Sequence, residues 1–191
     1  MPPALERLAP RLLDELSAVL LSANEEEIGE LRRLIRGAPR VFVGGMGRSG
    51  LVMRGFAMRL MHFGFTVHIP GDVTTPGIGP GDLLMLGSGT GRTPTLVQHT
   101  QRARMQGARV ALITAAPASP IAEEADCVVR LAASVPSRTG IEGSGGTPSM
   151  LPGGSLFEMS LALLLELVVL QIMDEIDATP DDLLARHANL E

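Results

Sequence analysis

The 191-residue sequence has a single cysteine, Cys127, and contains neither tryptophan nor tyrosine. One cysteine cannot form a disulfide within the chain, and it leaves no basis for a cysteine-based metal site. Its place in an apolar run is typical of a buried, inert thiol. Positive charge is also scarce, since 21 acidic residues outnumber 16 basic ones and give a formal net charge of −5. This balance argues against a general nucleic-acid surface, although a local basic cluster can still hold a small anion.

Long hydrophobic runs are missing too. The longest apolar stretch, residues 161–170, is interrupted by Glu166. It is shorter than the roughly 20 apolar residues that span a bilayer, so it predicts a core helix. Residues 1–7 lack a basic segment followed by an apolar one, which gives secretion no support. We therefore expect a cytoplasmic protein whose partners include neither a membrane nor nucleic acid.

The remaining pattern predicts an α/β protein. A hydrophobic content of 45% fits one domain with its own core. Apolar residues recur at helical spacing over residues 3–36, with a polar break at 24–27, which predicts two amphipathic helices. Short apolar runs then alternate with helical stretches, which predicts βα units and a parallel sheet. The expected strands are 41–45, 66–69, 83–87, 109–114 and 127–131.

We interpret the chain as a single α-β-α sandwich domain with a five-stranded parallel sheet. Helices are predicted over residues 49–62, 93–106 and 155–176. Thr179 and Pro180 predict the start of a short last helix. The expected organisation is N-terminal helices at 1–36, a β/α core at 37–131, a flexible loop at 132–154 and C-terminal helices at 155–191.

The flexible loop, residues 132–154, is rich in serine, glycine, proline and threonine and almost lacks an apolar pattern. That length is unusual for a passive connection in a compact domain, so we interpret it as a mobile active-site loop. A disordered surface loop is the alternative interpretation.

A first glycine-rich loop, residues 44–50, follows a predicted strand and opens a predicted helix. Free backbone N–H groups and the helix dipole favour an anion at such a place. Residues 45–50 also match the G-x-G-x-x-G pattern, with Asp72 about 20 residues further on, so a dinucleotide-binding unit must be considered. Glycines needed only for a tight turn are the simpler alternative.

A second loop, residues 87–93, places three hydroxyls and three glycines between another predicted strand and helix. Hydroxyls and free N–H groups together make a phosphate cradle. A dinucleotide fold does not need this second cluster, whereas a sugar phosphate lying across the strand ends can be held by both loops. Helix N-caps are the other role that serines and threonines have at such positions.

The second loop resembles the Ser-x-Ser-Gly-x-Thr phosphate motif of the sugar isomerase (SIS) domain family. Ser88, Thr90, Gly91 and Thr93 stand at the matching positions. The resemblance implies that these residues bind a sugar phosphate together with Ser49 of the first loop. The neighbouring loop residues Gly47, Arg48, Gly89 and Arg92 are also expected to bind substrate.

Segments over nearly the whole chain are similar to the 6-phospho-3-hexuloisomerases, a branch of this family. These segments are residues 47–50, 57–62, 74–76, 154–158 and 186–191. The resemblance implies a flavodoxin-like SIS fold, a homotetramer, and interconversion of 6-phospho-3-hexulose and fructose 6-phosphate. It also implies a place in the ribulose monophosphate pathway, with formaldehyde assimilation and pentose supply both open. Arg92, where many members have glutamate, and the long segment 137–154 depart from the family pattern.

Such an isomerisation requires removal of a carbon-bound proton, an enediol intermediate and reprotonation. Glu158 lies in the first turn of a predicted apolar helix, and both this position and the resemblance make it the first candidate for the base. The simpler interpretation is an acidic residue that interacts favourably with the helix dipole. Neutral histidine suits the acid, and the candidates are His62 and His187. His187 would act from the tail, in an oligomer within a neighbour's site. Arg48 is suited to pair with phosphate or a substrate hydroxyl.

We expect no cofactor and no metal, because no histidine, aspartate and glutamate group has metal-ligand spacing. Three alternative functions remain open at this point. They are another aldose–ketose phosphate isomerase, for example one acting on arabinose 5-phosphate, a non-catalytic sugar-phosphate sensor, and a nicotinamide-dependent oxidoreductase. Fold alone does not decide among them.

Overall fold

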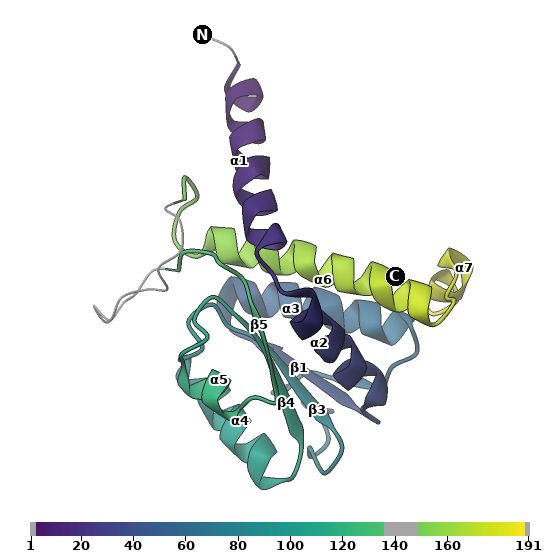
Figure 1. Ribbon diagram of the computed structural model, residues 1–191. Coiled ribbons are helices and arrows are strands. Elements are labelled where there is room, and N and C mark those ends of the chain that lie inside the picture. The colour runs from purple at the N-terminus through teal and green to yellow at the C-terminus, as the bar shows by residue number, and fades with distance from the viewer. Residues whose placement is uncertain (1–2, 136–148, 190–191) are drawn as a thin grey trace.

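The computed structural model describes residues 3–135 and 149–189, which form helices around one parallel sheet (Figure 1). The five strands lie in the order β2-β1-β3-β4-β5, and every neighbouring pair is parallel. This confirms the predicted fold class. The order is that of flavodoxin-like sheets and differs from that of the dinucleotide-binding fold. The strands are β1 (Val41–Gly45), β2 (Val67–His68), β3 (Leu83–Gly87), β4 (Arg109–Thr114) and β5 (Cys127–Arg130).

Helices cover both faces of the sheet, which explains why the strands are almost wholly apolar. Side chains alternate between the faces along each strand. Val41 and Val43 of β1 face the larger core with α1, α2, α3 and α6, whereas Phe42 faces α4 and α5. The helices are α1 (Ala4–Leu21), α2 (Glu25–Gly37), α3 (Gly47–His62), α4 (Pro94–Met105), α5 (Pro120–Glu124), α6 (Ser155–Glu175) and α7 (Pro180–Leu184).

Several elements differ from the sequence prediction; α4, β5 and α6 do so by no more than one residue at an end. The predicted strand 66–69 is a strand only over Val67–His68. The helix after β1 begins at Gly47, two residues before the predicted start. The short helix α5 was not predicted, because five residues are too few to show a helical period. The predicted polar break at 24–27 is the first turn of α2, where the Asn24 side chain caps the N–H groups of Glu26 and Glu27.

α6 is long and apolar enough to cross a membrane, with a mean hydropathy of 2.0 over its best window. Half of that window is buried inside the protein. The helix packs along α3 and receives the end of α1, so it forms the centre of the larger core (Figure 1). This agrees with the prediction of a core helix.

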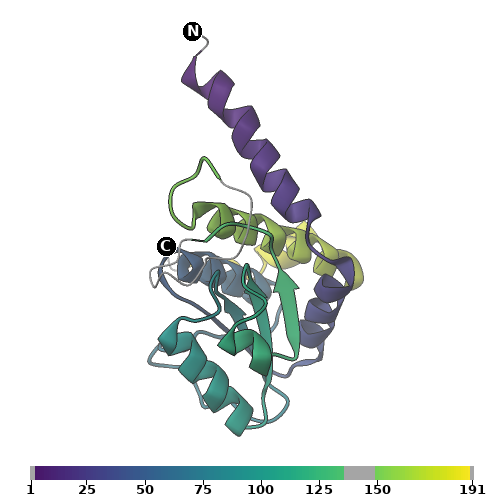
Figure 2. The same cartoon turned by 60° about the vertical axis from the view of Figure 1, so that its left-hand side comes forward.

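α1 extends away from the rest of the protein. Both views show its N-terminal half projecting beyond the sheet and the other helices (Figures 1 and 2). Only Leu16 and Val19, in its second half, are buried, while Leu5 and Leu13 are exposed. Of the two N-terminal helices, α2 therefore packs on the domain along its whole length and α1 only by its C-terminal half.

A buried carboxylate fixes the start of β3. The Asp82 side chain is 1% exposed. Its carboxylate accepts hydrogen bonds from Nε and from a terminal nitrogen of Arg40, at 3.0 and 2.6 Å. Its carboxylate also accepts the backbone N–H of Gly79 at 2.7 Å. Arg54 and Asp72 form a similar two-point pair, but their side chains are 50% and 45% exposed.

We predict that Asp82→Ala lowers the free energy of unfolding by about 3 kcal/mol, because it leaves a half-buried guanidinium and a backbone N–H without their acceptor. The matched change Asp72→Ala should cost about 0.5 kcal/mol, since water replaces an exposed partner. Urea unfolding of both variants measures the difference. Equal losses would contradict this account of the two pairs.

Candidate active site

Two glycine-rich loops leave the carboxyl ends of neighbouring strands. The parallel register of β1 and β3 pairs Gly45 with Gly87, so both loops begin side by side. The helices that follow them, α3 and α4, lie on opposite faces of the sheet. In open α/β sheets such a reversal of direction opens a crevice, which is where ligands bind.

The first loop makes so close a turn that it requires glycine. A side chain at Gly50 would place a Cβ atom 2.6 Å from the carbonyl oxygen of Gly45. Gly47 begins α3 with a φ of 57°, which favours glycine. The loop thus brings the start of α3, with Arg48 and Ser49, directly onto the end of β1.

The second loop is held by its own hydroxyl groups. The Ser88 hydroxyl accepts the N–H of Gly91 at 3.2 Å and lies 3.5 Å from the Thr93 hydroxyl. Gly91 has a φ of 58°, and a Cβ there would lie 2.0 Å from the Ser119 hydroxyl. Thr93 is the N-cap residue of α4, yet its side chain makes no capping hydrogen bond. Capping therefore does not explain the hydroxyl of Thr93.

A cavity of about 220 Å³ joins the two loops to the start of α6. Its polar lining consists of hydroxyls from both loops and one carboxylate, from Ser49, Ser88, Thr90, Thr93 and Glu158. Gly87 and Gly89 contribute backbone to the same wall. The structure thus brings the predicted base, Glu158, together with the predicted phosphate-binding hydroxyls, which lie 65 or more residues before it in the sequence.

Glu158 and Arg48 form an ion pair at this cavity. The distance from Arg48 Nε to Glu158 Oε2 is 2.7 Å, and the side chains are 65% and 18% exposed. The contact uses one of the five N–H donors of the guanidinium. A carboxylate at the cavity wall is able to accept a proton, and the adjacent cation is able to stabilise negative charge on a bound ligand.

Arg92 points elsewhere. A terminal nitrogen of its guanidinium donates to the backbone carbonyl of Ala118 at 3.0 Å, and the side chain is exposed. Its backbone N–H donates to the Thr90 hydroxyl at 3.3 Å. Arg92 therefore connects the second loop to the segment before α5, and it does not line the cavity.

The two candidate acids lie together but away from this cavity. The rings of His62 and His187 stack with centroids 5.1 Å apart, and His62 is 2% exposed. Burial, and then the positive charges of His187 and Arg59, lower the pKa of His62, which favours its neutral form. At a helical rise of about 1.5 Å per residue, His62 lies about 20 Å along α3 from Ser49. Within one chain the structure does not bring these histidines to the cavity.

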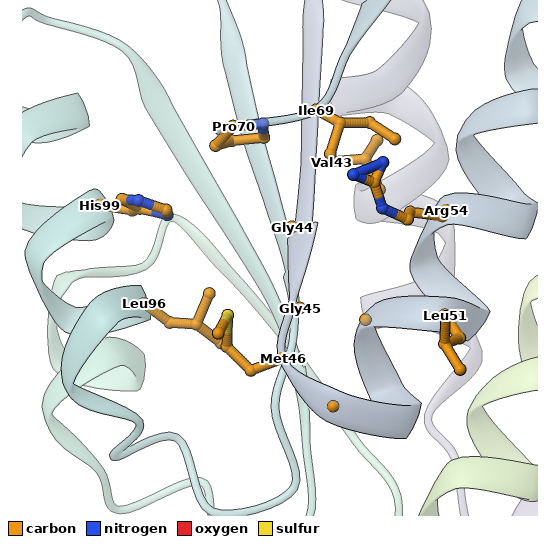
Figure 3. A pocket seen from close by; sticks show the side chains of 12 residues that line it. Val43, Gly44, Gly45, Met46, Leu51, Arg54, Ile69, Pro70, Leu96 and His99 are labelled. Carbon is orange, nitrogen blue, oxygen red and sulfur yellow. The ribbon is translucent and has the colours of Figure 1, made fainter. Parts of the chain in front are cut away.

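A second cavity, of about 260 Å³, shares Met46 and Leu96 with the first. Its lining residues are shown in Figure 3. Figure 3 shows His99 and Leu96 of α4 on one side and Arg54 and Leu51 of α3 on the other, with β1 between them. No motif singles out His99 in the sequence, since it is one polar residue among several on a helix. Of the predicted loop at 132–154, residues 136–148 lie outside the described residues. In its described parts, Val135 and Gly154 line the first cavity.

The fold and the hydroxyl-lined cavity together define a flavodoxin-like α/β protein with a site for a phosphorylated ligand. The SIS domain model matches residues 34–163. The chain is 43% identical to the 3-hexulose-6-phosphate isomerase of Mycobacterium gastri over 93% of this chain and 87% of that protein. It is 36% identical to the enzyme of the same name from Bacillus subtilis, over 94% and 95% of the two chains.

A solved structure supports the same assignment. The crystal structure of a Methanococcus jannaschii protein, from which a function of 3-hexulose-6-phosphate isomerase was inferred, has a TM-score of 0.82 and 28% identity, covering 97% of this chain and 99% of that one. This chain belongs to the SIS domain family. The dinucleotide-binding interpretation of residues 45–50 is thereby replaced, because those glycines form the first loop of an SIS domain.

We predict that Thr93→Val weakens binding of inorganic phosphate about tenfold, because it removes one hydroxyl from the proposed cradle without removing a capping hydrogen bond. Thr95→Val, on the exposed side of the same helix, is the matched control and should leave binding unchanged. Isothermal titration calorimetry measures both. A Thr93 variant that binds phosphate like the native chain would remove this hydroxyl from the cradle.

Proposed function

We propose that this chain is an isomerase that interconverts 6-phospho-3-hexulose and fructose 6-phosphate. The observation that carries the proposal is the position of Glu158, a carboxylate in the same cavity as the hydroxyls of both loops. The relatives named 3-hexulose-6-phosphate isomerase are matched over almost their full length, so their activity supports a function of the whole chain. The reaction is an intramolecular oxidoreduction and transfers only protons.

The phosphate is proposed to bind the second loop and Ser49. Ser88, Thr90 and Thr93 supply hydroxyl donors, while the loop backbone and the start of α4 supply N–H groups. Gly47, Gly89 and Gly91 allow the backbone to approach the ligand closely. A phosphate held there leaves the carbon chain to extend toward Glu158, which lines the same cavity.

Glu158 is proposed to remove the proton from C2 of the hexulose. The electrons of the C2–H bond then form the C2=C3 double bond, and the carbonyl oxygen on C3 becomes negatively charged. Reprotonation at C3 by the same carboxylate, with transfer of the hydroxyl proton from O2 to O3, gives fructose 6-phosphate. Arg48, 2.7 Å from Glu158, is the nearest cation to stabilise this intermediate.

The acid for the oxygen protons is proposed to be His187 or His62 of a neighbouring subunit. His62 lies about 20 Å along α3 from Ser49 and His187 stacks on it, which makes a role within the same chain geometrically unfavourable. Exposed leucines on α1 and on the outer side of α6 support association of several chains, which we propose is a homotetramer. Leu5, Leu13, Leu163, Leu167 and Leu170 are the apolar side chains concerned.

We further propose that the whole chain works as one SIS domain in the cytoplasm, within the ribulose monophosphate pathway. Sugar phosphates are intracellular intermediates, and the single cysteine is consistent with a reducing compartment. Both formaldehyde assimilation and pentose supply use the same isomerisation, in opposite directions.

We predict that Glu158→Gln lowers kcat by about 10³-fold, since the amide cannot take up the carbon-bound proton. Substrate should still bind, because the hydroxyl cradle is intact. The control is Glu166→Gln, an exposed carboxylate two turns further along α6. Conversion of 6-phospho-3-hexulose and calorimetric binding of fructose 6-phosphate are measured for all three proteins. A native chain that binds the sugar phosphate but does not convert it would favour a sensor or a different phosphosugar.

A second prediction tests whether each active site contains residues of two chains. Chains carrying Glu158→Gln are mixed with chains carrying His187→Asn, dissociated and reassembled. If each site takes its glutamate from one chain and its histidine from another, about a quarter of the sites become intact and activity returns to that level. A histidine that acts within its own chain gives no recovery, because every site then lacks one of the two groups.

A further inference from the structure

A side chain of α1 holds the segment that leads into α6. The carboxylate of Glu15 accepts hydrogen bonds from the Ser149 hydroxyl and from the backbone N–H of Met150, the second at 3.1 Å. Figure 1 shows this segment rising beside α1, away from the sheet. The two residues joined in this way lie 134 positions apart in the sequence.

The contact continues into a defined path toward α6. The Ser149 hydroxyl accepts the N–H of Leu151 at 3.0 Å, and Leu151 packs against the larger core. The N–H of Ser155 then donates to the carbonyl of Pro152 at 3.2 Å. Residues 149–155 are therefore tied at one end to α1 and at the other to the first turn of α6.

This path ends at the proposed base. Gly154 is the N-cap residue of α6 and lines the first cavity. The N–H of Glu158 donates to the carbonyl of Gly154 at 3.0 Å, the first hydrogen bond of the helix. The backbone of Glu158 is thus linked directly to Gly154, and both residues line the cavity.

We infer that Glu15 is a positioning residue for the isomerisation, which holds residues 149–154 against α1 and thereby sets the position of Glu158. The inference rests on the proposed function, because it assigns Glu158 the role of base. It gives the projecting helix α1 a task at the active site, although no residue of α1 lines the cavity.

The charge of Glu15 suits this task. The hydrogen bond from Ser149, followed by that from the Met150 N–H and the nearby Arg11, lowers the pKa of Glu15 against the opposing effect of desolvation. The carboxylate is thus ionised at neutral pH, and hydrogen bonds to an ionised acceptor are shorter and stronger than neutral ones.

The test compares Glu15→Ala and Glu15→Gln with the native enzyme, and Asp14→Ala, an exposed neighbour on α1, serves as the control. We expect Glu15→Ala to lower kcat about 10- to 100-fold with KM nearly unchanged, since misplacing a catalytic group by about 1 Å costs up to that factor. Phosphate contacts lie on the two loops and are not affected. The glutamine still accepts a hydrogen bond, so Glu15→Gln should restore most of the rate.

Ser149→Ala completes a double-mutant cycle. Because Ser149 acts through Glu15, the double variant Glu15→Ala, Ser149→Ala should be no slower than Glu15→Ala alone. Independent effects that multiply, an equal loss of kcat in Asp14→Ala, or a fall that appears in KM rather than in kcat would each overturn the inference.

Amide hydrogen exchange separates this inference from the proposed function. Residues 150–158 should exchange faster in Glu15→Ala than in the native chain, whatever the reaction catalysed. Unchanged exchange overturns the inference and leaves the isomerase assignment untouched. Faster exchange with unchanged kcat also overturns it, since the contact would then order the segment without positioning the base. Failure of the native chain to isomerise 6-phospho-3-hexulose contradicts the proposed function instead.

Discussion

The parallel pairing of β1 with β3 is the constraint on which the site depends. It places Gly45 beside Gly87, so the loops after both strands start at one edge of the sheet. The following helices leave toward opposite faces, and the crevice between the loops is left open. A slip in this register would separate Ser49 from Ser88 and abolish the shared cavity. Both strands are buried on both faces, so a shifted register would disturb close packing on each side.

α6 connects this edge to the rest of the protein. It is the most apolar helix of the chain, and its buried side packs along α3. Its first turn carries Glu158, which lines the cavity and pairs with Arg48 from the first turn of α3. The packing that stabilises the domain therefore also brings the two charged side chains together. The helix pair that stabilises the domain thus also positions the two residues to which we assign the chemistry.

Much of the fold was predictable because its signals are local. Apolar runs of four to six residues between glycine-rich turns indicated the strands, and β1, β3 and β4 have the predicted bounds. The glycine and hydroxyl content of the two loops was enough to predict them as binding loops. The resemblance of the second loop to the SIS motif predicted the family. α5 and the shortness of β2 were not predictable, since neither leaves a periodic pattern.

The contacts of the site were harder to predict, because they join residues distant in sequence. Nothing local indicates that Arg48 meets Glu158, that Arg92 turns to Ala118, or that His62 stacks on His187. The same holds for Glu15 and Ser149, which a helix and a loop bring together across most of the chain. Such pairs form because whole helices and strands pack against one another. The order of residues along the sequence does not show which elements will pack together.

The central claim is that a carboxylate at the end of the phosphate cradle transfers a carbon-bound proton. The most direct test is conversion of 6-phospho-3-hexulose by the native chain in D2O, followed by NMR. Because Glu158 is 18% exposed, its proton can exchange with solvent during the lifetime of the enediol. The account predicts fructose 6-phosphate with deuterium at C3 in part of the product. Product without any deuterium at C3, even after prolonged equilibration with the enzyme in D2O so that each molecule reacts many times, would indicate a direct hydride shift and would contradict the assigned mechanism.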